Sequence, residues 1–252
     1  ILHPWSSNPS LGFFLVGISS GVIWALSILT IIYGVKKLEV SRVIPMASVY
    51  PVFVAIMAAP ILNERFSLIQ YISILLTVAG VVLLAQNSLA TSESSRKKAN
   101  LYIYLIVLFG SVLSGVAHIA YKYALLEFDF WDLFLLRSLC CFSVWFICGL
   151  HSRLLYELKL LYSDKTALSV FISAECVIIP MAVISMAAAL AIGPVSVVST
   201  LLSIRPLFVL IISGLLSTSQ WNVLNEPFTK DTLPPKLLFT SMIVLGVMGV
   251  LL

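Results

Sequence analysis

The sequence predicts an all-α fold, a polytopic transmembrane helical bundle built from two inverted repeats. The first observation is the composition, because 60% of the 252 residues are hydrophobic and only 10% are charged. The mean hydropathy of +1.08 lies far from that of a soluble domain. The second observation is a series of apolar segments of membrane-spanning length. The third is a motif that occurs in two of these segments.

About eight apolar segments are candidate membrane spans, because a helix needs about 17 to 25 mainly apolar residues to cross the hydrocarbon layer. They cover residues 11–34, 43–62, 68–86, 101–125, 131–150, 167–191, 195–217 and 237–252. The polar segments between them are short, so no aqueous domain is expected. Residues 87–100 are rich in Ser and end in a basic run, which predicts a flexible linker. Pro234 and Pro235 are expected to delay the start of the last helix.

The repeated motif occupies the second and seventh segments. Residues 40–56 read VSRVIPMASVYPVFVAI and residues 195–211 read VSVVSTLLSIRPLFVLI. Aligned without gaps, they share Val, Ser and Val at the start, a central Ser, and Pro-x-Phe-Val-x-Ile at the end. The intervening spans suggest an odd number of crossings per repeat, which inverts the second copy. Inverted helical halves are typical of alternating-access transporters, because the halves can rock about a site at their interface.

Several motifs resemble the EamA repeat of the drug/metabolite transporter superfamily. They are Pro51-x-Phe53, LNER at 62–65 and AGVVLL at 79–84 in the first half, and Pro206-x-Phe208 and GVMGVLL at 246–252 in the second. The resemblance implies ten helices in two inverted five-helix repeats, of which about eight are present here. Residues 1–86 would be a first repeat that lacks its first two helices, 87–100 a linker and 101–252 the second repeat. Lys122 and Arg137 match basic residues that are common in this repeat.

Charged groups inside apolar spans are functional candidates, because a buried charge is costly unless it is paired or hydrated. Arg205 lies about 15 Å into its span, near the midplane, and Glu175 about 12 Å into the preceding antiparallel span. The two residues are therefore predicted to be able to touch. They form either a structural ion pair or a substrate site. In the site, Arg205 binds a carboxylate or phosphate, and Glu175 is a counter-ion, a proton carrier or an amine ligand.

The repeat adds Tyr50 to this proposed substrate site. Tyr50 precedes Pro51 as Arg205 precedes Pro206, so symmetry-related helices would present both side chains to one cavity. Each proline removes a backbone hydrogen bond and is predicted to break its helix or act as a hinge. The alternative is a packing kink in each helix.

Four further residues are candidates. His118 titrates near neutral pH and suits proton coupling, although a hydrogen-bonded packing histidine is an equal alternative. Lys122 follows His118 by four residues. It is expected to reach toward an acidic cluster as a coupling or structural charge, and Arg137 is expected to share those partners. Trp24 lies in mid-span and is predicted to line a substrate cavity. The acidic cluster comprises Glu127, Asp129 and Asp132.

The predicted function is secondary active transport of a small zwitterionic or anionic metabolite, such as an amino acid, as the family resemblance implies. The expected direction is export, and coupling would use protons or a counter-substrate. The alternatives are a sugar-phosphate or nucleotide-sugar type exchanger, a lipid-carrier flippase and, from a different class, a non-transporting membrane scaffold. The predicted location is the plasma (inner) membrane, crossed several times by a monomer or homodimer.

An enzyme is not predicted, because no nucleophile–base pair or other catalytic constellation is legible. The four cysteines match no metal spacing, so neither a metal nor a cofactor is expected. The net charge of +4 comes from loop residues, so nucleic acid is not an expected partner. The expected partners are the small-molecule substrate and the lipid bilayer.

Overall fold

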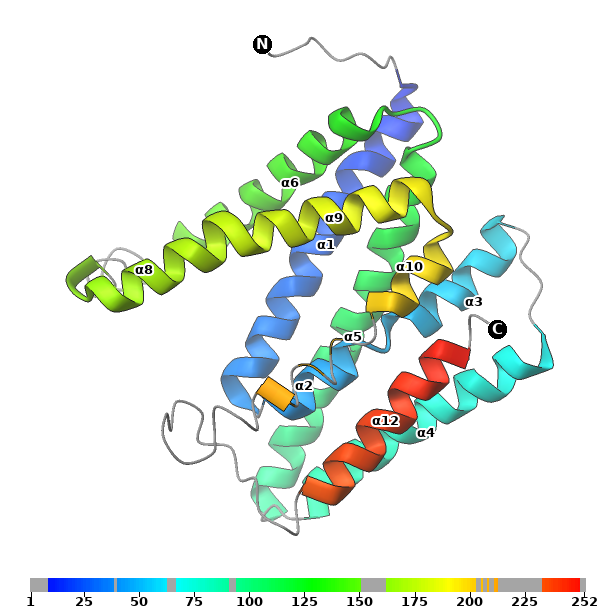
Figure 1. Ribbon diagram of the computed structural model, residues 1–252, viewed down its shortest axis with the longest axis vertical. Coiled ribbons are helices and arrows are strands. Elements are labelled where there is room, and N and C mark those ends of the chain that lie inside the picture. Colours follow the sequence, from blue (N-terminus) through cyan, green and yellow to red (C-terminus); the bar gives the residue numbers. More distant parts are fainter. Residues whose placement is uncertain are drawn as a thin grey trace. The chain divides into compact units, whose positions relative to one another are not determined.

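The computed structural model describes residues 9–38, 40–62, 67–90, 94–150, 162–202, 205, 208, 211–212 and 233–249. Their regular elements are all helices, and these described residues contain no strand (Figure 1). The helices are α1 (Leu11–Lys37), α2 (Val40–Ala47), α3 (Tyr50–Leu62), α4 (Leu68–Ala90), α5 (Ser94–Ala124), α6 (Phe130–Leu150), α8 (Lys165–Ser173), the π-helix η1 (Ala174–Ile178), α9 (Ile179–Ile192), α10 (Val195–Leu202) and α12 (Leu233–Gly249). The predicted all-α fold is confirmed.

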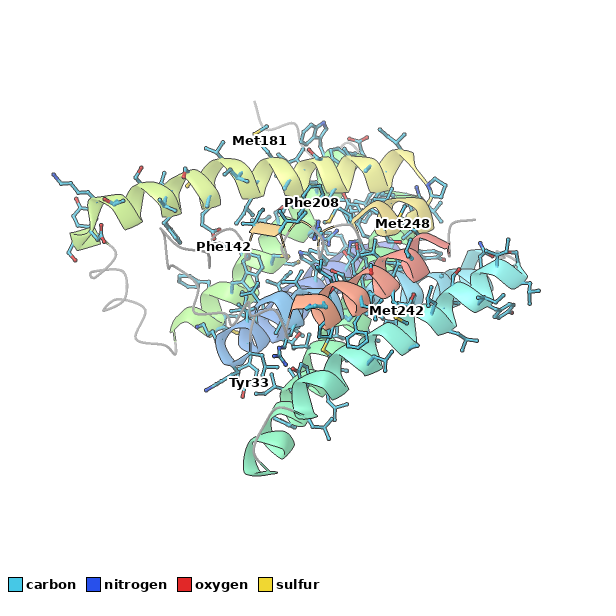
Figure 2. The ribbon with its side chains drawn as sticks, turned by 60° about the horizontal axis from the view of Figure 1, so that its bottom comes forward. Tyr33, Phe142, Met181, Phe208, Met242 and Met248 are labelled. Atoms are coloured by element: carbon cyan, nitrogen blue, oxygen red, sulfur yellow. The ribbon has the colours of Figure 1, made fainter. Side chains whose placement is uncertain are left out.

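Within the described residues, four helical stretches are long and apolar enough to cross a membrane: Leu11–Lys37, Leu101–Ala124, Phe130–Gly149 and Leu168–Ile192. Shorter apolar helices cover Arg42–Met57, Leu68–Thr77 and Leu237–Gly249. Large apolar side chains stand on the outside of these helices, as Phe142 and Met181 do with 63% and 65% of their surfaces exposed (Figure 2). Such a surface is unfavourable in water and favourable in lipid. The chain is an integral, multi-pass membrane protein.

Two segments are more helical than the sequence predicted. Residues 87–90 continue α4 and residues 94–100 begin α5, although 87–100 was expected to be a flexible linker. Its role between the two halves stays a prediction. The prolines at 234 and 235 do not delay α12, because the helix begins at Leu233 and holds both in its first turn. Proline is tolerated there, since the first backbone N–H groups of a helix have no partner within it.

The chain forms two compact units, which are described separately. The first unit comprises Ile1–Ala25 and Ala120–Pro194, and the second comprises Leu26–Ile119 and Val195–Leu252. Helix α1 is divided after Ala25 and helix α5 after Ile119, so each of these helices has one part in each unit.

In the first unit, α1 packs closely on α6 through small residues at four-residue spacing. A Cβ added to Gly17 would lie 2.9 Å from Cδ2 of Leu136, and one added to Gly21 would lie 2.9 Å from the backbone oxygen of Arg137. One turn further along α1, the carbonyl of Ala25 accepts a hydrogen bond from Nε1 of Trp145 at 3.3 Å. Small residues at this spacing let two helix backbones approach each other inside a membrane.

In the second unit, α4 and α12 lie side by side and antiparallel (Figure 1). Three successive contacts show the direction: Ser73 with Gly249, Thr77 with Gly246, and Gly80 with Ile243. This contact joins the last described helix to the helix that ends the predicted first repeat, and the division into two inverted repeats stays a prediction.

The same unit has an apolar core in which the two halves of the sequence meet. Its buried residues are Val43, Met46, Ala47, Val49, Val52, Tyr104, Val107, Ile243 and Val247. Helix α10 also packs against α3, and these helices carry the two copies of the motif. The parts of the motif at 40–56 and 195–202 thus lie within one unit.

Candidate functional site

A helix break positions Tyr50 in the second unit. Helix α2 ends at Ala47, Ser48 and Val49 form a turn, and α3 begins at Tyr50. Pro51 occupies the second position of α3, where its missing N–H breaks no hydrogen bond within the helix. The break predicted from Pro51 is therefore present and lies just before it. Pro206 lies outside the described residues.

Tyr50 and His118 form a stacked pair inside this unit. Their ring centroids are 5.0 Å apart and their planes are inclined by 17°. Tyr50 is buried and His118 is fully enclosed. The hydroxyl of Tyr50 donates a long hydrogen bond of 3.4 Å to the carbonyl of Ser199 in α10. The pair thus connects α3, α5 and α10 through polar side chains in an apolar environment.

The orientation of the imidazole ring is fixed by the preceding turn of α5. Nδ1 of His118 lies 2.6 Å from the carbonyl oxygen of Ser114. Because a carbonyl can only accept, Nδ1 carries a proton, and Nε2 is the nitrogen that changes protonation. Ser114 also joins a second contact, since its hydroxyl lies 2.5 Å from that of Ser27, which donates to the carbonyl of Gly110 at 2.8 Å. The sequence analysis did not select these serines, although the four-residue spacing of Ser114 and His118 was visible.

Arg205 lies near this pair. Its guanidinium is close enough to the Tyr50 hydroxyl to interact with it electrostatically, and its side chain is exposed. The predicted cavity that Arg205 and Tyr50 would share stays a prediction. Glu175 belongs to the other unit, so its predicted contact with Arg205 stays a prediction.

Glu175 is exposed and lies in the π-helix η1. The N–H of Ile179 donates to the carbonyl of Ala174, five residues earlier, immediately before Pro180. Proline has no N–H and crowds the carbonyl four residues before it, and a π-type turn at that point lets the helix continue. The sequence showed the proline but not this local widening.

The first unit holds a second group of candidate residues around Arg137. The central guanidinium carbon of Arg137 lies 4.7 Å from the ring centroid of Trp24 and 4.7 Å from that of Tyr121. The Arg137 side chain is only 5% exposed. Among the described residues no carboxylate pairs with it, so the expected acidic partners are not observed. Trp24 is one of the site residues predicted from the sequence, and Tyr121 is not.

Lys122 also differs from its expected role. Its ammonium group donates to the carbonyls of Leu190, Ala191 and Gly193, at 2.9, 3.3 and 3.0 Å. These carbonyls lie at the end of α9, where backbone oxygens have no partner within the helix. Lys122 therefore caps α9 rather than pairing with the acidic cluster, because three carbonyls at the helix end accept hydrogen bonds from its ammonium group.

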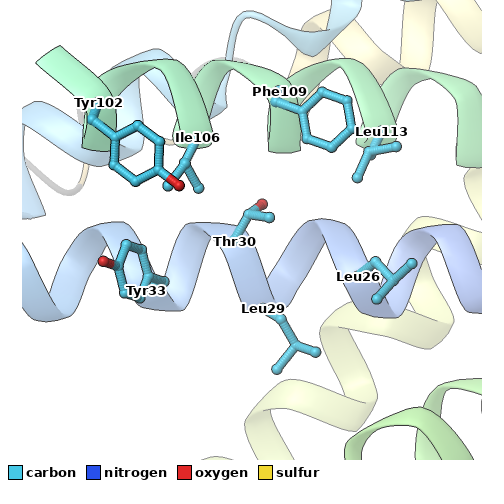
Figure 3. Close-up of a pocket in the computed structure, with 8 residues that line it drawn as sticks. All are labelled: Leu26, Leu29, Thr30, Tyr33, Tyr102, Ile106, Phe109 and Leu113. Carbon is cyan, nitrogen blue, oxygen red and sulfur yellow. The ribbon is translucent and has the colours of Figure 1, made fainter. Parts of the chain in front are cut away.

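A groove of about 420 Å³ lies between α1 and α5 in the second unit (Figure 3). Its lining residues are Leu26, Leu29, Thr30, Tyr33, Tyr102, Ile106, Phe109 and Leu113. The hydroxyl of Thr30 is engaged, since it donates to the carbonyl of Ser27 at 2.6 Å. The two tyrosines lie at one end of the groove, and the rest of the wall is mostly aliphatic. We therefore do not place a charged substrate there.

Comparison with protein families finds one similarity, in the first part of the chain. The EamA-like transporter family matches residues 2–86, about a third of the chain. This EamA segment covers α1 to α3 and most of α4, and it contains Trp24, Tyr50 and Pro51. A comparison with curated proteins found no match.

The family that matches residues 2–86 is a family of transporters, which agrees with the predicted class of function. The matched segment nearly coincides with the predicted first repeat at 1–86. The second repeat at 101–252 stays a prediction. No group of three or more His, Cys, Asp or Glu side chains that could hold a metal ion occurs in the described part of the chain.

Proposed function

We propose that this chain is a secondary active transporter that exports a small zwitterionic or anionic metabolite, such as an amino acid, by alternating access. We also propose that the protein is located in the plasma (inner) membrane. The EamA segment supports transport, and the antiparallel pairing of α4 and α12 supports two inverted halves. The observation that carries the proposal is the buried Tyr50–His118 pair beside a helix break.

The pair fits a transport site for two physical reasons. At this break the N–H groups of Ser48 and Val49 remain bonded to the preceding turn, but Pro51 has no N–H to offer to the carbonyl four residues before it. Broken helices commonly form transport sites, because such backbone groups can bind ligands inside a membrane. The phenol and imidazole add groups that can donate, accept and stack on a substrate. Arg205 supplies positive charge beside them, which suits a substrate carboxylate.

His118 is also the proposed carrier of the coupling proton. Its Nδ1 is held by Ser114, so protonation at Nε2 would add a positive charge beside Tyr50. A charge that appears inside a membrane changes the relative free energies of the inward-open and outward-open states. The proton gradient can drive transport through this change. Counter-substrate exchange is the alternative coupling.

The test is transport by the purified chain in proteoliposomes. Radiolabelled amino acids, sugar phosphates and cationic drugs are compared with and without a pH gradient, and with and without unlabelled counter-substrate. We expect pH-dependent or counter-substrate-dependent movement of amino acids above that of protein-free vesicles. Movement of sugar phosphates alone would favour the exchanger alternative. Movement equal to that of empty vesicles for every compound would favour the scaffold alternative.

A further inference from the structure

A buried positive charge lies in the first unit, and the described residues provide no counter-ion for it. Arg137 is 5% exposed, its Nη2 atom has no hydrogen-bond partner, and within the described residues no carboxylate pairs with it. Its position, about 10 Å from the start of α6, places it inside the apolar span. Taking a charged group out of water is costly unless an opposite charge or hydrogen bonds compensate it.

The neighbouring aromatic rings compensate only part of this cost. Trp24 and Tyr121 each place a ring centroid 4.7 Å from the guanidinium carbon. A ring face attracts a cation but accepts no strong hydrogen bond from the N–H groups in the guanidinium plane. The arrangement therefore leaves hydrogen-bonding capacity at Arg137 that the described part of the chain does not use.

A second unused donor belongs to the same cluster. The hydroxyl of Tyr121 is buried and also has no hydrogen-bond partner among the described residues. A guanidinium offers only donors, and a phenol can donate as well. Two neighbouring donor groups, one of them charged, match a ligand that has only acceptors and carries negative charge. The backbone beside them is fixed, because Gly21 packs directly against Arg137 and accepts from Sγ of Cys141 at 3.3 Å.

From this cluster we infer that Arg137, Tyr121 and Trp24 form a binding site for an oxyanion group, a carboxylate or a phosphate. The guanidinium provides two parallel N–H groups to the oxyanion, and the Tyr121 hydroxyl provides a further donor. The indole of Trp24 screens the charged pair from the lipid. The oxyanion comes either from a transported solute or from a lipid headgroup. If the oxyanion belongs to a transported solute, the inference depends on the proposed transport function.

Binding is measured first in maltoside micelles that are free of phospholipid. The full chain is titrated with amino acids, with their carboxamides and with inorganic phosphate, and thermal stability and tryptophan fluorescence are recorded. A solute source predicts that an amino acid binds at least about tenfold more tightly than its carboxamide, because one charge-assisted hydrogen-bond pair is lost. In a second arm, phosphatidylglycerol and an uncharged diacylglycerol are added. A lipid source predicts binding of the phosphatidylglycerol alone.

The deciding variant is Tyr121→Phe, which keeps the ring against Arg137 and removes only the unused hydroxyl. An oxyanion site predicts about tenfold weaker binding with unchanged or higher thermal stability, since an unsatisfied buried hydroxyl is removed. A purely structural cluster predicts unchanged binding. Arg137→Gln should bind the oxyanion probe no more tightly than the matching uncharged compound, the carboxamide or the diacylglycerol. Arg137→Lys keeps the positive charge and should retain part of the difference in affinity. Trp145→Phe is the control, because it alters the same α1–α6 contact without touching Arg137.

The inference is overturned if no oxyanion probe binds the unmodified chain, or if Tyr121→Phe and a folded Arg137→Gln variant bind as tightly as the unmodified chain. Failure of the transport proposal looks different. In that case an oxyanion probe binds and the variants weaken it, but no compound moves in proteoliposomes.

Discussion

The imidazole ring of His118 stacks on the phenol ring of Tyr50 at a centroid distance of 5.0 Å. Tyr50 comes from the start of a helix that follows a break, and His118 comes from the last two turns of α5. The two are separated by more than sixty residues in the sequence. Their contact joins the helix break to a group that can take up a proton, and the first two predictions follow from it.

Replacing His118 with Gln should uncouple transport from the proton gradient. The amide keeps a polar side chain of similar length but does not titrate near neutral pH. We expect pH-gradient-driven movement to fall about 100-fold or more, as is typical when a proton-transfer group is lost, while exchange with a counter-substrate persists. The measurement is a comparison of the two assays in proteoliposomes.

Ser114→Ala is the matched control for the His118 variant. It removes the hydroxyl contact with Ser27 but keeps the carbonyl that fixes His118. Proton coupling should therefore survive in this variant. Full pH dependence in His118→Gln would rule out His118 as the proton carrier.

The hydroxyl and the ring of Tyr50 should contribute very differently to the free energy of unfolding. Tyr50→Phe removes only a long hydrogen bond of 3.4 Å, so the loss should stay below about 1 kcal/mol. Tyr50→Ala removes a buried ring stacked on His118 and should cost about 3 kcal/mol. Thermal unfolding of the purified variants in micelles measures both. Equal losses would show that the ring stack contributes little to stability.

Gly246→Ala should weaken the pairing of α4 and α12. The added Cβ would lie 2.7 Å from the Ser73 carbonyl oxygen and 2.7 Å from the Thr77 nitrogen, and neither backbone atom can move alone. We expect a loss of about 1–3 kcal/mol from overpacking. Gly12→Ala is the control, since nothing lies within 4 Å of its added Cβ. The melting temperature should fall for the first variant and stay equal or rise for the second.

Lys122→Met should loosen the end of α9 and leave substrate specificity unchanged. The variant keeps the length of the side chain but removes all three hydrogen bonds to the carbonyls of Leu190, Ala191 and Gly193. We expect faster amide hydrogen exchange in the last turn of α9, because the capped end frays. Lys122→Arg should restore most of the protection. Unaltered exchange in Lys122→Met would show that the cap is not needed.

Much of the fold could be predicted because a membrane span is a local property of the sequence. The apolar segments at 11–34, 68–86 and 131–150 correspond to α1, α4 and α6, since the free energy of placing a segment in lipid depends on its own side chains. The expectation for Pro51 succeeded for a similar reason, because a proline acts on the backbone next to it. The expectation for 87–100 failed, since a polar segment next to two long helices can extend them.

The sequence by itself determined that this chain crosses a membrane several times, that its fold is all-α and that a motif is duplicated within it. Only the tertiary structure decided the partners of the charged and polar side chains. His118 meets Tyr50, Lys122 caps α9, and Arg137 lies against Trp24 and Tyr121 rather than beside a carboxylate. The physical reason is that the cost of a buried charge is set by the groups that packing brings to it. Those groups come from helices far apart in the sequence.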